Sequence, residues 1–353
     1  MVLAAAVAAT FLASGAPLRA ADLRILWVQD ARGSTRDDTA VNFAEMLEEQ
    51  MGISSEVFFV GVQPGRVDQL LVAVQRHSFL GVDLVLGLTQ SQIRVLEDFK
   101  ALREISLSQI GFGEFQALAL PASGSASGSL RQSQDPGRAL GIPIELSLPV
   151  VCYDREQLGH LADYSPSILE ISYGKVAGRV AMSDPRFDTV GRAVLLSSFM
   201  DAGGISGGWE LVQQLDSFVD RYAATHWASC EAVAKGSADL GFTQLASAEV
   251  IANRWPRLGI QALRDGLFVP VYFAAAMQEP AAEEWVIEKV LNWLAHDYLS
   301  REFDALRSVA ERENLDYSVE TVMKLSSALD YFPTADLVNE WSARYDFKSE
   351  RRE

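Results

Sequence analysis

Residues 178–196 read GRVAMSDPRFDTVGRAVLL, and this stretch carries the clearest signature of the fold. It opens with a short apolar run typical of a buried strand. Asp184 and the proline after it mark a turn, and an apolar pattern with helical spacing begins after Asp188 and Thr189. A strand that passes into a helix through capping residues is the repeating unit of α/β proteins, which bind ligands beside the carboxyl ends of strands. The turn is therefore a candidate ligand site, with plain helix capping as the alternative.

The same alternation of strand and helix fills the region before this stretch. The patterns predict strands at 23–29, 54–62 and 82–88 and helices at 40–52, 66–79 and 91–102. Such a rhythm implies a mostly parallel sheet with helices on both faces. A segment rich in serine and glycine follows at 121–138 and has the composition of a solvent loop.

Two long extended runs, 140–154 and 260–277, bracket a second block of strands and helices. Each run is too long for one ordinary strand, so both are interpreted as crossings between two α/β lobes. Between them we expect strands at 176–182 and 238–244, helices at 155–173, 193–204, 209–222, 227–236 and 246–255, and a loop at GGISGG (203–208). The predicted division is lobe 1 at 22–146 plus 269–300, lobe 2 at 147–268, and C-terminal helices packing across the lobes at 301–353, including 318–332 and 334–347.

The first 21 residues, MVLAAAVAATFLASGAPLRAA, resemble a secretory signal peptide. An apolar run from Val2 to Ala13 is followed by small residues and the single charge of Arg19. The alternative is a short membrane anchor, but the run is too short to span and Pro17 interrupts it. We therefore expect export to the periplasm with cleavage of residues 1–21.

Composition excludes some classes of partner. The chain of 353 residues has a net charge of −17, which argues against nucleic acids and anionic lipid surfaces as partners.

The sequence also bears on catalysis and metal binding. Its only cysteines are Cys152 and Cys230, and whether they pair or stay as thiols is open. No phosphate-binding loop, nucleophile elbow or zinc motif is present, and His226 with Cys230 lacks an orienting acid in the sequence. We expect neither an enzyme nor a cofactor nor a bound metal.

Several motifs together resemble the type-II periplasmic solute-binding proteins of ABC importers. They are VDLVLGL (82–88), VCYDREQL (151–158), GKVAGRVAMSDPR (174–186), EAVAKGSADLGFT (231–243) and WVIEKVLNWLAHDYLSREF (285–303), in the order and spacing of the receptors for iron, thiamine, polyamines and hexose phosphates. The resemblance implies a two-lobed monomer that captures a small solute by hinge closure. It further implies delivery of that solute to a membrane permease with its ATPase subunits.

The thiamine receptors show the nearest resemblance, through VDLVLGL, DPRFDTVG and a tryptophan before K-G-x-x-D-L. This resemblance implies that Asp188 and Thr189 face the ligand and that Trp227 stacks on it. The chain departs from that branch at Gln244 and Glu249, where the thiamine receptors have aromatic residues, and it lacks the adjacent tyrosines of ferric-iron receptors. We expect a thiamine-like or other cationic solute. Ferric iron, a phosphorylated sugar and a sensing role for a signalling partner remain alternatives.

Position in the expected fold supplies the other candidate ligand contacts. Polar residues that follow a strand, or that interrupt an apolar crossing, face the cleft in such an architecture. The full set of expected ligand-binding residues is Asp30, Ser34, Thr89, Gln90, Glu145, Asp188, Thr189, Trp227 and Tyr272. At the 188–189 turn two alternatives remain open: the helix end holds an anion, or Thr189 caps the helix and Asp188 holds a cation.

Overall fold

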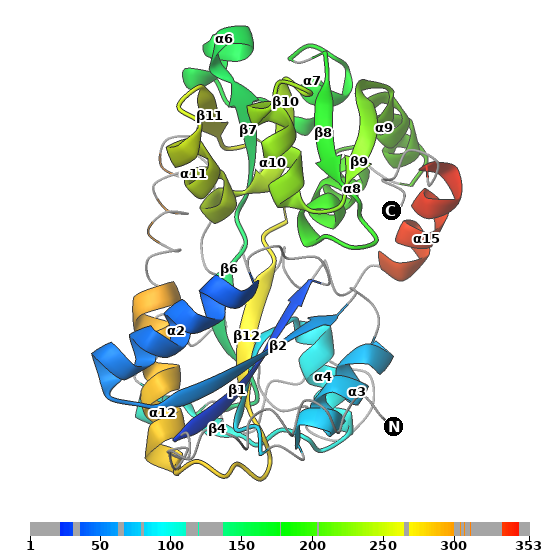
Figure 1. The fold of residues 1–353 in the computed structure, drawn as a ribbon. Helices are drawn as coiled ribbons and strands as arrows, with labels where there is room; N and C mark the ends of the chain where they lie inside the picture. Colours follow the sequence, from blue (N-terminus) through cyan, green and yellow to red (C-terminus); the bar gives the residue numbers. More distant parts are fainter. Residues whose placement is uncertain are drawn as a thin grey trace, which may run out of the picture.

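The protein consists of two α/β lobes, shown one above the other in Figure 1. This computed structural model describes residues 22–30, 36–62, 67–78, 81–110, 119, 137–176, 178–202, 205–264, 268–299, 304, 307, 311 and 334–345. The expected leader (1–21), most of the Ser/Gly segment and the helix expected at 318–332 lie outside the described residues. Among the described helices, none has the length and apolar character needed to cross a membrane.

Lobe 1 is built on a five-stranded sheet in the order β2-β1-β3-β12-β6. Its strands are β1 (Leu23–Asp30), β2 (Ser55–Val62), β3 (Leu84–Leu88), β6 (Ile142–Leu146) and β12 (Val271–Ala276). The first three are parallel, whereas β12 runs antiparallel to both β3 and β6. The accompanying helices are α2 (Arg36–Met51), α3 (Val67–Ser78), α4 (Gln90–Asp98), α5 (Leu107–Ile110) and α12 (Glu284–Trp293), which a π-helical turn extends over Leu294–Leu299. A small ladder joins β4 (Ile105–Ser106) to β5 (Arg138–Ala139).

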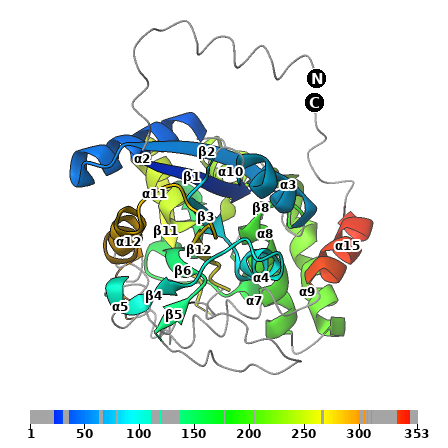
Figure 2. The same ribbon diagram turned by 90° about the horizontal axis from the view of Figure 1, so that it is seen from below.

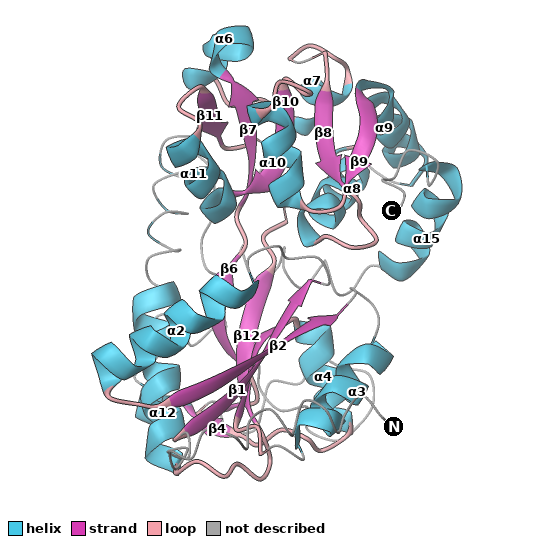
Figure 3. Cartoon of the chain, viewed as in Figure 1, coloured by secondary structure: helices cyan, strands magenta, loops and turns pink. Residues whose placement is uncertain are grey.

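Lobe 2 repeats this plan with a sheet in the order β11-β7-β10-β8-β9 (Figure 3). Its strands are β7 (Pro149–Asp154), β8 (Val180–Ser183), β9 (Val219–Ala223), β10 (Leu240–Gln244) and β11 (Leu258–Gln261). Strands β8, β9 and β10 are parallel, and β7 is antiparallel to β10 and β11. The helices are α6 (Arg155–Leu158), a 3-10 turn (Gly159–Ala162), α7 (Ile168–Ser172), α8 (Thr189–Asp201), α9 (Ile205–Phe218), α10 (His226–Ala234) and α11 (Leu245–Arg254).

Two expectations for lobe 2 were wrong in detail. The helix expected at 209–222 ends at Phe218, and strand β9 follows. The buried residues Val219 and Tyr222 are three residues apart, a spacing that indicates a helix, and the strand accommodates it through a shift in register against β8. The expected loop 203–208 is helical from Ile205 onward. Gly208 serves helix packing there, since a Cβ at this position would lie 2.1 Å from the ring of Phe199 on α8.

The two long extended runs do cross between the lobes, each divided into two strands. The first splits into β6 and β7 around Ser147, and the second into β11 and β12. The Ser147 N–H donates to the Pro270 carbonyl at 2.8 Å, so the two crossings are hydrogen-bonded to each other. The paired crossings connect the two lobes at the position where a hinge would lie.

Each lobe has its own apolar core. Helix α15 (Thr334–Tyr345) packs on the core of lobe 2, where Trp341 is fully buried and meets the ring of Tyr222 edge-on at 4.7 Å. In Figures 1 and 2 this helix lies on the outer side of lobe 2 beside α9. The described part of the C-terminal region is therefore anchored to lobe 2.

Candidate interlobe site

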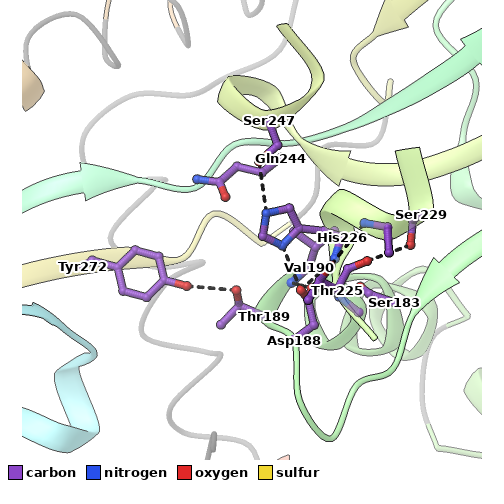
Figure 4. A network of polar contacts seen from close by, with 12 residues as sticks. Ser183, Asp188, Thr189, Val190, Thr225, His226, Ser229, Gln244, Ser247 and Tyr272 are labelled. Atoms are coloured by element: carbon purple, nitrogen blue, oxygen red, sulfur yellow. Dashed lines mark hydrogen bonds and ion pairs between the residues drawn. The ribbon is translucent and has the colours of Figure 1, made fainter. Parts of the chain in front are cut away.

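Three strand-to-helix junctions of lobe 2 meet at one edge of its sheet. Strands β8, β9 and β10 are parallel neighbours, so their carboxyl ends lie together. Asp188 follows β8, His226 follows β9, and Ser247 follows β10. The topology thus brings side chains from three separate segments into one polar network, which Figure 4 shows.

Asp188 is the N-cap of α8, and its carboxylate is occupied by groups of its own lobe. Oδ1 accepts from Val190 N at 2.9 Å, Gly191 N at 3.2 Å and Ser183 Oγ at 2.8 Å. Oδ2 accepts from both the backbone N and the ring Nδ1 of His226, each at 2.8 Å. With the residue only 1% exposed, this carboxylate has little capacity left for a ligand. Of the two caps considered from the sequence, the structure shows Asp188.

Electrostatics hold the carboxyl group of Asp188 in its ionised form. Burial alone would raise the pKa of Asp188, but the charge of His226 and the hydrogen bonds from His226 and Ser183 outweigh it and hold that pKa below its usual range. Because the ionised carboxylate can only accept, His226 carries its proton on Nδ1. Whenever the ring is neutral, Nε2 is therefore an acceptor, and Ser247 Oγ lies 3.2 Å from it.

The first acid of the same turn has a structural role. Asp184 is buried and receives the guanidinium of Arg186 at 2.6 Å. Arg186 also donates to Ser342 Oγ at 3.3 Å and lies over the ring of Trp341, both on α15. The sequence Asp-Pro-Arg therefore ties the β8–α8 turn to the C-terminal helix.

Side-chain hydrogen bonds join this edge of lobe 2 to lobe 1. Thr189 Oγ1 lies 2.8 Å from the hydroxyl of Tyr272, and Gln244 Nε2 donates to Glu145 Oε1 at 3.1 Å. Glu145 and Tyr272 are direct cross-strand partners on β6 and β12, so they present neighbouring polar groups to lobe 2. Each contact joins two residues that are far apart in sequence and that meet between the lobes.

Glu145 is the charged member of this interlobe set. Desolvation raises the pKa of its carboxyl above the usual value, although the hydrogen bond from Gln244 and the charge of His226 act in the opposite direction. In the described part of the chain neither a lysine nor an arginine forms an ion pair with it. No lysine or arginine of the described residues therefore neutralises this carboxylate.

The other residues expected to contact the ligand lie in different parts of the two lobes. Thr89 caps α4 in a capping box with Gln92, and Gln90 is the first residue of that helix. Asp30 ends β1 but its side chain is not described, and Ser34 lies outside the described residues. Trp227 donates to Glu231 Oε1 at 3.0 Å and packs on a small apolar cluster of lobe 2.

That cluster includes both cysteines. Cys152 and Cys230 are buried, free thiols. Burial and the neighbouring Cys230 raise the pKa of Cys152 well above its usual value, so it is held as an unreactive thiol. His226 does not pair with Cys230 but with Asp188, the orienting acid that the sequence alone did not identify.

Sequence reasoning missed Ser247 and gave Gln244 no ligand role. Both follow a strand and open a helix, which is the signal that had singled out Asp188. What was lacking was the order of the strands in the sheet, since it alone shows that these junctions are neighbours. Among the described residues, the structure shows no group of three or more His, Cys, Asp or Glu side chains arranged to hold a metal ion.

The two sheets, their strand orders and the paired crossings define the two-lobed fold of type-II periplasmic binding proteins. Neither a family model nor a curated protein sequence matches the chain. Solved structures do match in fold. They include AfuA from Actinobacillus pleuropneumoniae, with fructose-6-phosphate bound (12% identity, TM-score 0.58, covering 91% of this chain and 97% of that one).

Two further structures extend the comparison. Iron-bound HitA from Pseudomonas aeruginosa has 13% identity and a TM-score of 0.59, covering 89% of this chain and 99% of that one. A periplasmic thiamin binding protein has 15% identity and a TM-score of 0.56, covering 91% of this chain and 95% of that one. At such identities the similarity establishes the fold, and the solute must be argued from the site.

Proposed function

We propose that this protein is the solute-binding component of an ABC importer, and that it captures a small cationic solute between its lobes. The fold supports the transport role, because AfuA with bound fructose-6-phosphate, iron-bound HitA and a periplasmic thiamin binding protein share it over about nine-tenths of this chain. Location in the periplasm, action as a monomer and delivery to a permease with its ATPase are parts of this proposal.

Hinge closure is the mechanism that the contacts support. The Thr189–Tyr272 and Gln244–Glu145 pairs both bridge the lobes, and in the part of the chain that the structure describes two crossings, hydrogen-bonded to each other, connect them. A solute that touches both lobes stabilises the closed arrangement over the open one, and the permease would recognise that closed form.

The single observation that carries the choice of a cationic solute is the environment of Glu145. Its carboxylate faces the other lobe with only an amide as a hydrogen-bond donor, and desolvation raises its pKa. An ammonium or other cation placed beside it would supply the missing charge. Since Asp188 is occupied by five donors, Glu145 is the better candidate to hold that cation.

A panel of probes tests this proposal by thermal unfolding of protein refolded free of solute. The probes are thiamine, spermidine, fructose-6-phosphate and ferric citrate. A cation that binds the folded state should raise the melting temperature, with about 2.7 kcal/mol of stabilisation at a hundredfold excess over its dissociation constant. The Glu145→Gln variant should lose most of that shift. A shift with fructose-6-phosphate alone, retained in Glu145→Gln, would contradict the cationic assignment.

A further inference from the structure

We propose that Ser247, His226 and Asp188 form a nucleophile–base–acid relay that gives this protein a hydrolytic activity toward small carboxylic esters. The inference goes beyond solute binding and does not depend on it. Its basis is a chain of two contacts: Ser247 Oγ to His226 Nε2 at 3.2 Å, and His226 Nδ1 to Asp188 Oδ2 at 2.8 Å. These are the contacts, in the same order, of a serine nucleophile, its general base and the orienting acid.

The acid of the relay is held in the required state. Asp188 is buried, ionised and fixed by Ser183 and two backbone N–H groups, so it cannot turn away from the imidazole. It sets the tautomer in which Nδ1 carries the proton and Nε2 the lone pair. The ring itself is anchored because the His226 backbone N–H also binds Asp188. A single carboxylate thus fixes both the position and the tautomer of the base.

The serine lies where a developing negative charge would be stabilised. Ser247 is partly exposed and is the third residue of α11. The N-cap of that helix, Gln244, makes no side-chain cap because its amide donates to Glu145 instead. Leu245 N–H is taken by the Leu148 carbonyl, and the N–H groups that follow in the first turn have no acceptor within the helix. They and the positive end of the helix dipole are suited to a tetrahedral oxyanion.

The reaction balances with water as the only co-reactant. Ser247 Oγ bonds to the ester carbonyl carbon while its proton passes to His226 Nε2. The carbon–oxygen bond to the alcohol then breaks, and the alcohol leaves with that proton. Water attacks the acyl-serine, Nε2 takes and returns a proton, and the carboxylic acid is released with Ser247 restored. No electron is gained or lost in either half of the cycle.

Labelling of the mature protein with a serine-directed fluorophosphonate tests the relay. We expect one covalent adduct, located on Ser247 by peptide mass spectrometry, together with slow hydrolysis of p-nitrophenyl acetate. Ser247→Ala should abolish both. His226→Asn retains a donor toward Asp188 but removes the base, so it should slow labelling by about 100-fold or more. The matched control is Ser217→Ala, an exposed helical serine whose Oγ donates to the Gln214 carbonyl, and it should label as the unchanged protein does.

A second variant keeps the test decisive should Ser247→Ala unfold. Ser247→Cys would place a thiol beside His226, and iodoacetamide should alkylate it at pH 6, where ordinary thiols react slowly. The two native cysteines are buried and should not compete. Adding His226→Asn should remove this reactivity. An unlabelled wild-type protein, a label on another serine, or reactivity that His226→Asn leaves unchanged would each overturn the proposal, whatever solute the protein binds.

Discussion

The hydroxyls of Thr189 and Tyr272 lie 2.8 Å apart, although 83 residues separate them in the chain. Thr189 opens α8 at the edge of lobe 2, and Tyr272 lies near the start of β12 in lobe 1. The first belongs to the stretch that defines the strand-to-helix unit, and the second to a crossing strand. Their contact therefore links the two features from which the two-lobed fold is predicted, and it reports directly on the separation of the lobes.

Removing the Tyr272 hydroxyl should shift the lobes toward an open arrangement. A net hydrogen bond contributes about 0.5–1.5 kcal/mol, so Tyr272→Phe should raise the ratio of open to closed forms roughly two- to tenfold. Small-angle X-ray scattering of the solute-free protein would show this as a larger radius of gyration. Tyr173→Phe, at an exposed position of lobe 2, is the control and should leave the radius unchanged. An identical radius for Tyr272→Phe and the unchanged protein would show that the contact does not hold the lobes.

Glu145 should make the stability of the solute-free protein fall as pH rises. Desolvation raises its folded-state pKa above the ordinary 4.5, so the folded protein binds the proton more tightly than the unfolded chain. Stability is then lost as pH increases from about 4.5 through the raised pKa. Glu145→Gln should flatten this part of the profile and unfold at higher urea than the parent at pH 7.5. The midpoints of urea unfolding at pH 4.5, 6 and 7.5 measure this difference. If the midpoints of the two proteins changed in parallel with pH, Glu145 would not be the source of the pH dependence.

Asp188 should matter more to stability than a surface cap does. Asp188→Ala removes a helix cap and leaves the Ser183 and His226 donors without their acceptor, at an expected cost of about 2–4 kcal/mol. Since its folded-state pKa is lowered, its contribution is present above the usual pKa of 3.8 and is lost as pH falls below it. Urea unfolding at pH 7 and pH 3 should show the penalty shrinking at the lower pH. An equal loss of stability at both pH values would show that Asp188 stabilises the fold through packing alone.

A methyl group at Gly191 should disturb the turn that holds the network. A Cβ there would lie 2.3 Å from the Ser183 carbonyl oxygen, which belongs to the backbone and cannot swing aside. We expect Gly191→Ala to cost about 1–3 kcal/mol by overpacking. Gly159→Ala is the matched control, because a Cβ at that position meets nothing within 4 Å. Equal melting temperatures for the two variants would contradict this account of the turn.

Periodicity in the sequence was enough to predict most strands and helices, because buried strands such as 82–88 and amphipathic helices such as 91–102 have unambiguous periods. It failed at β9, where the buried Val219 and Tyr222 have the spacing of a helix, and at Gly208, whose small size allows close packing of α8 and α9. The site was harder to predict. Asp188, Glu145 and Tyr272 stand out as polar groups at junctions or in apolar crossings.

The partners of these residues could not be predicted in the same way. His226 meets Asp188 from 38 residues away only because β8 and β9 are adjacent and parallel. Ser247 joins them because β10 lies on the other side of β8. Strand order is set by packing across the whole lobe, and no local pattern in the chain encodes it.

The central claim is that a cationic solute occupies the space between the lobes and is held by Glu145. Native mass spectrometry of the protein, purified from its own host without refolding, measures this most directly. The account predicts a co-purified small molecule that carries a positive charge when released, bound one to one and absent from the Glu145→Gln variant prepared in the same way. An anionic molecule retained equally by both proteins would contradict it.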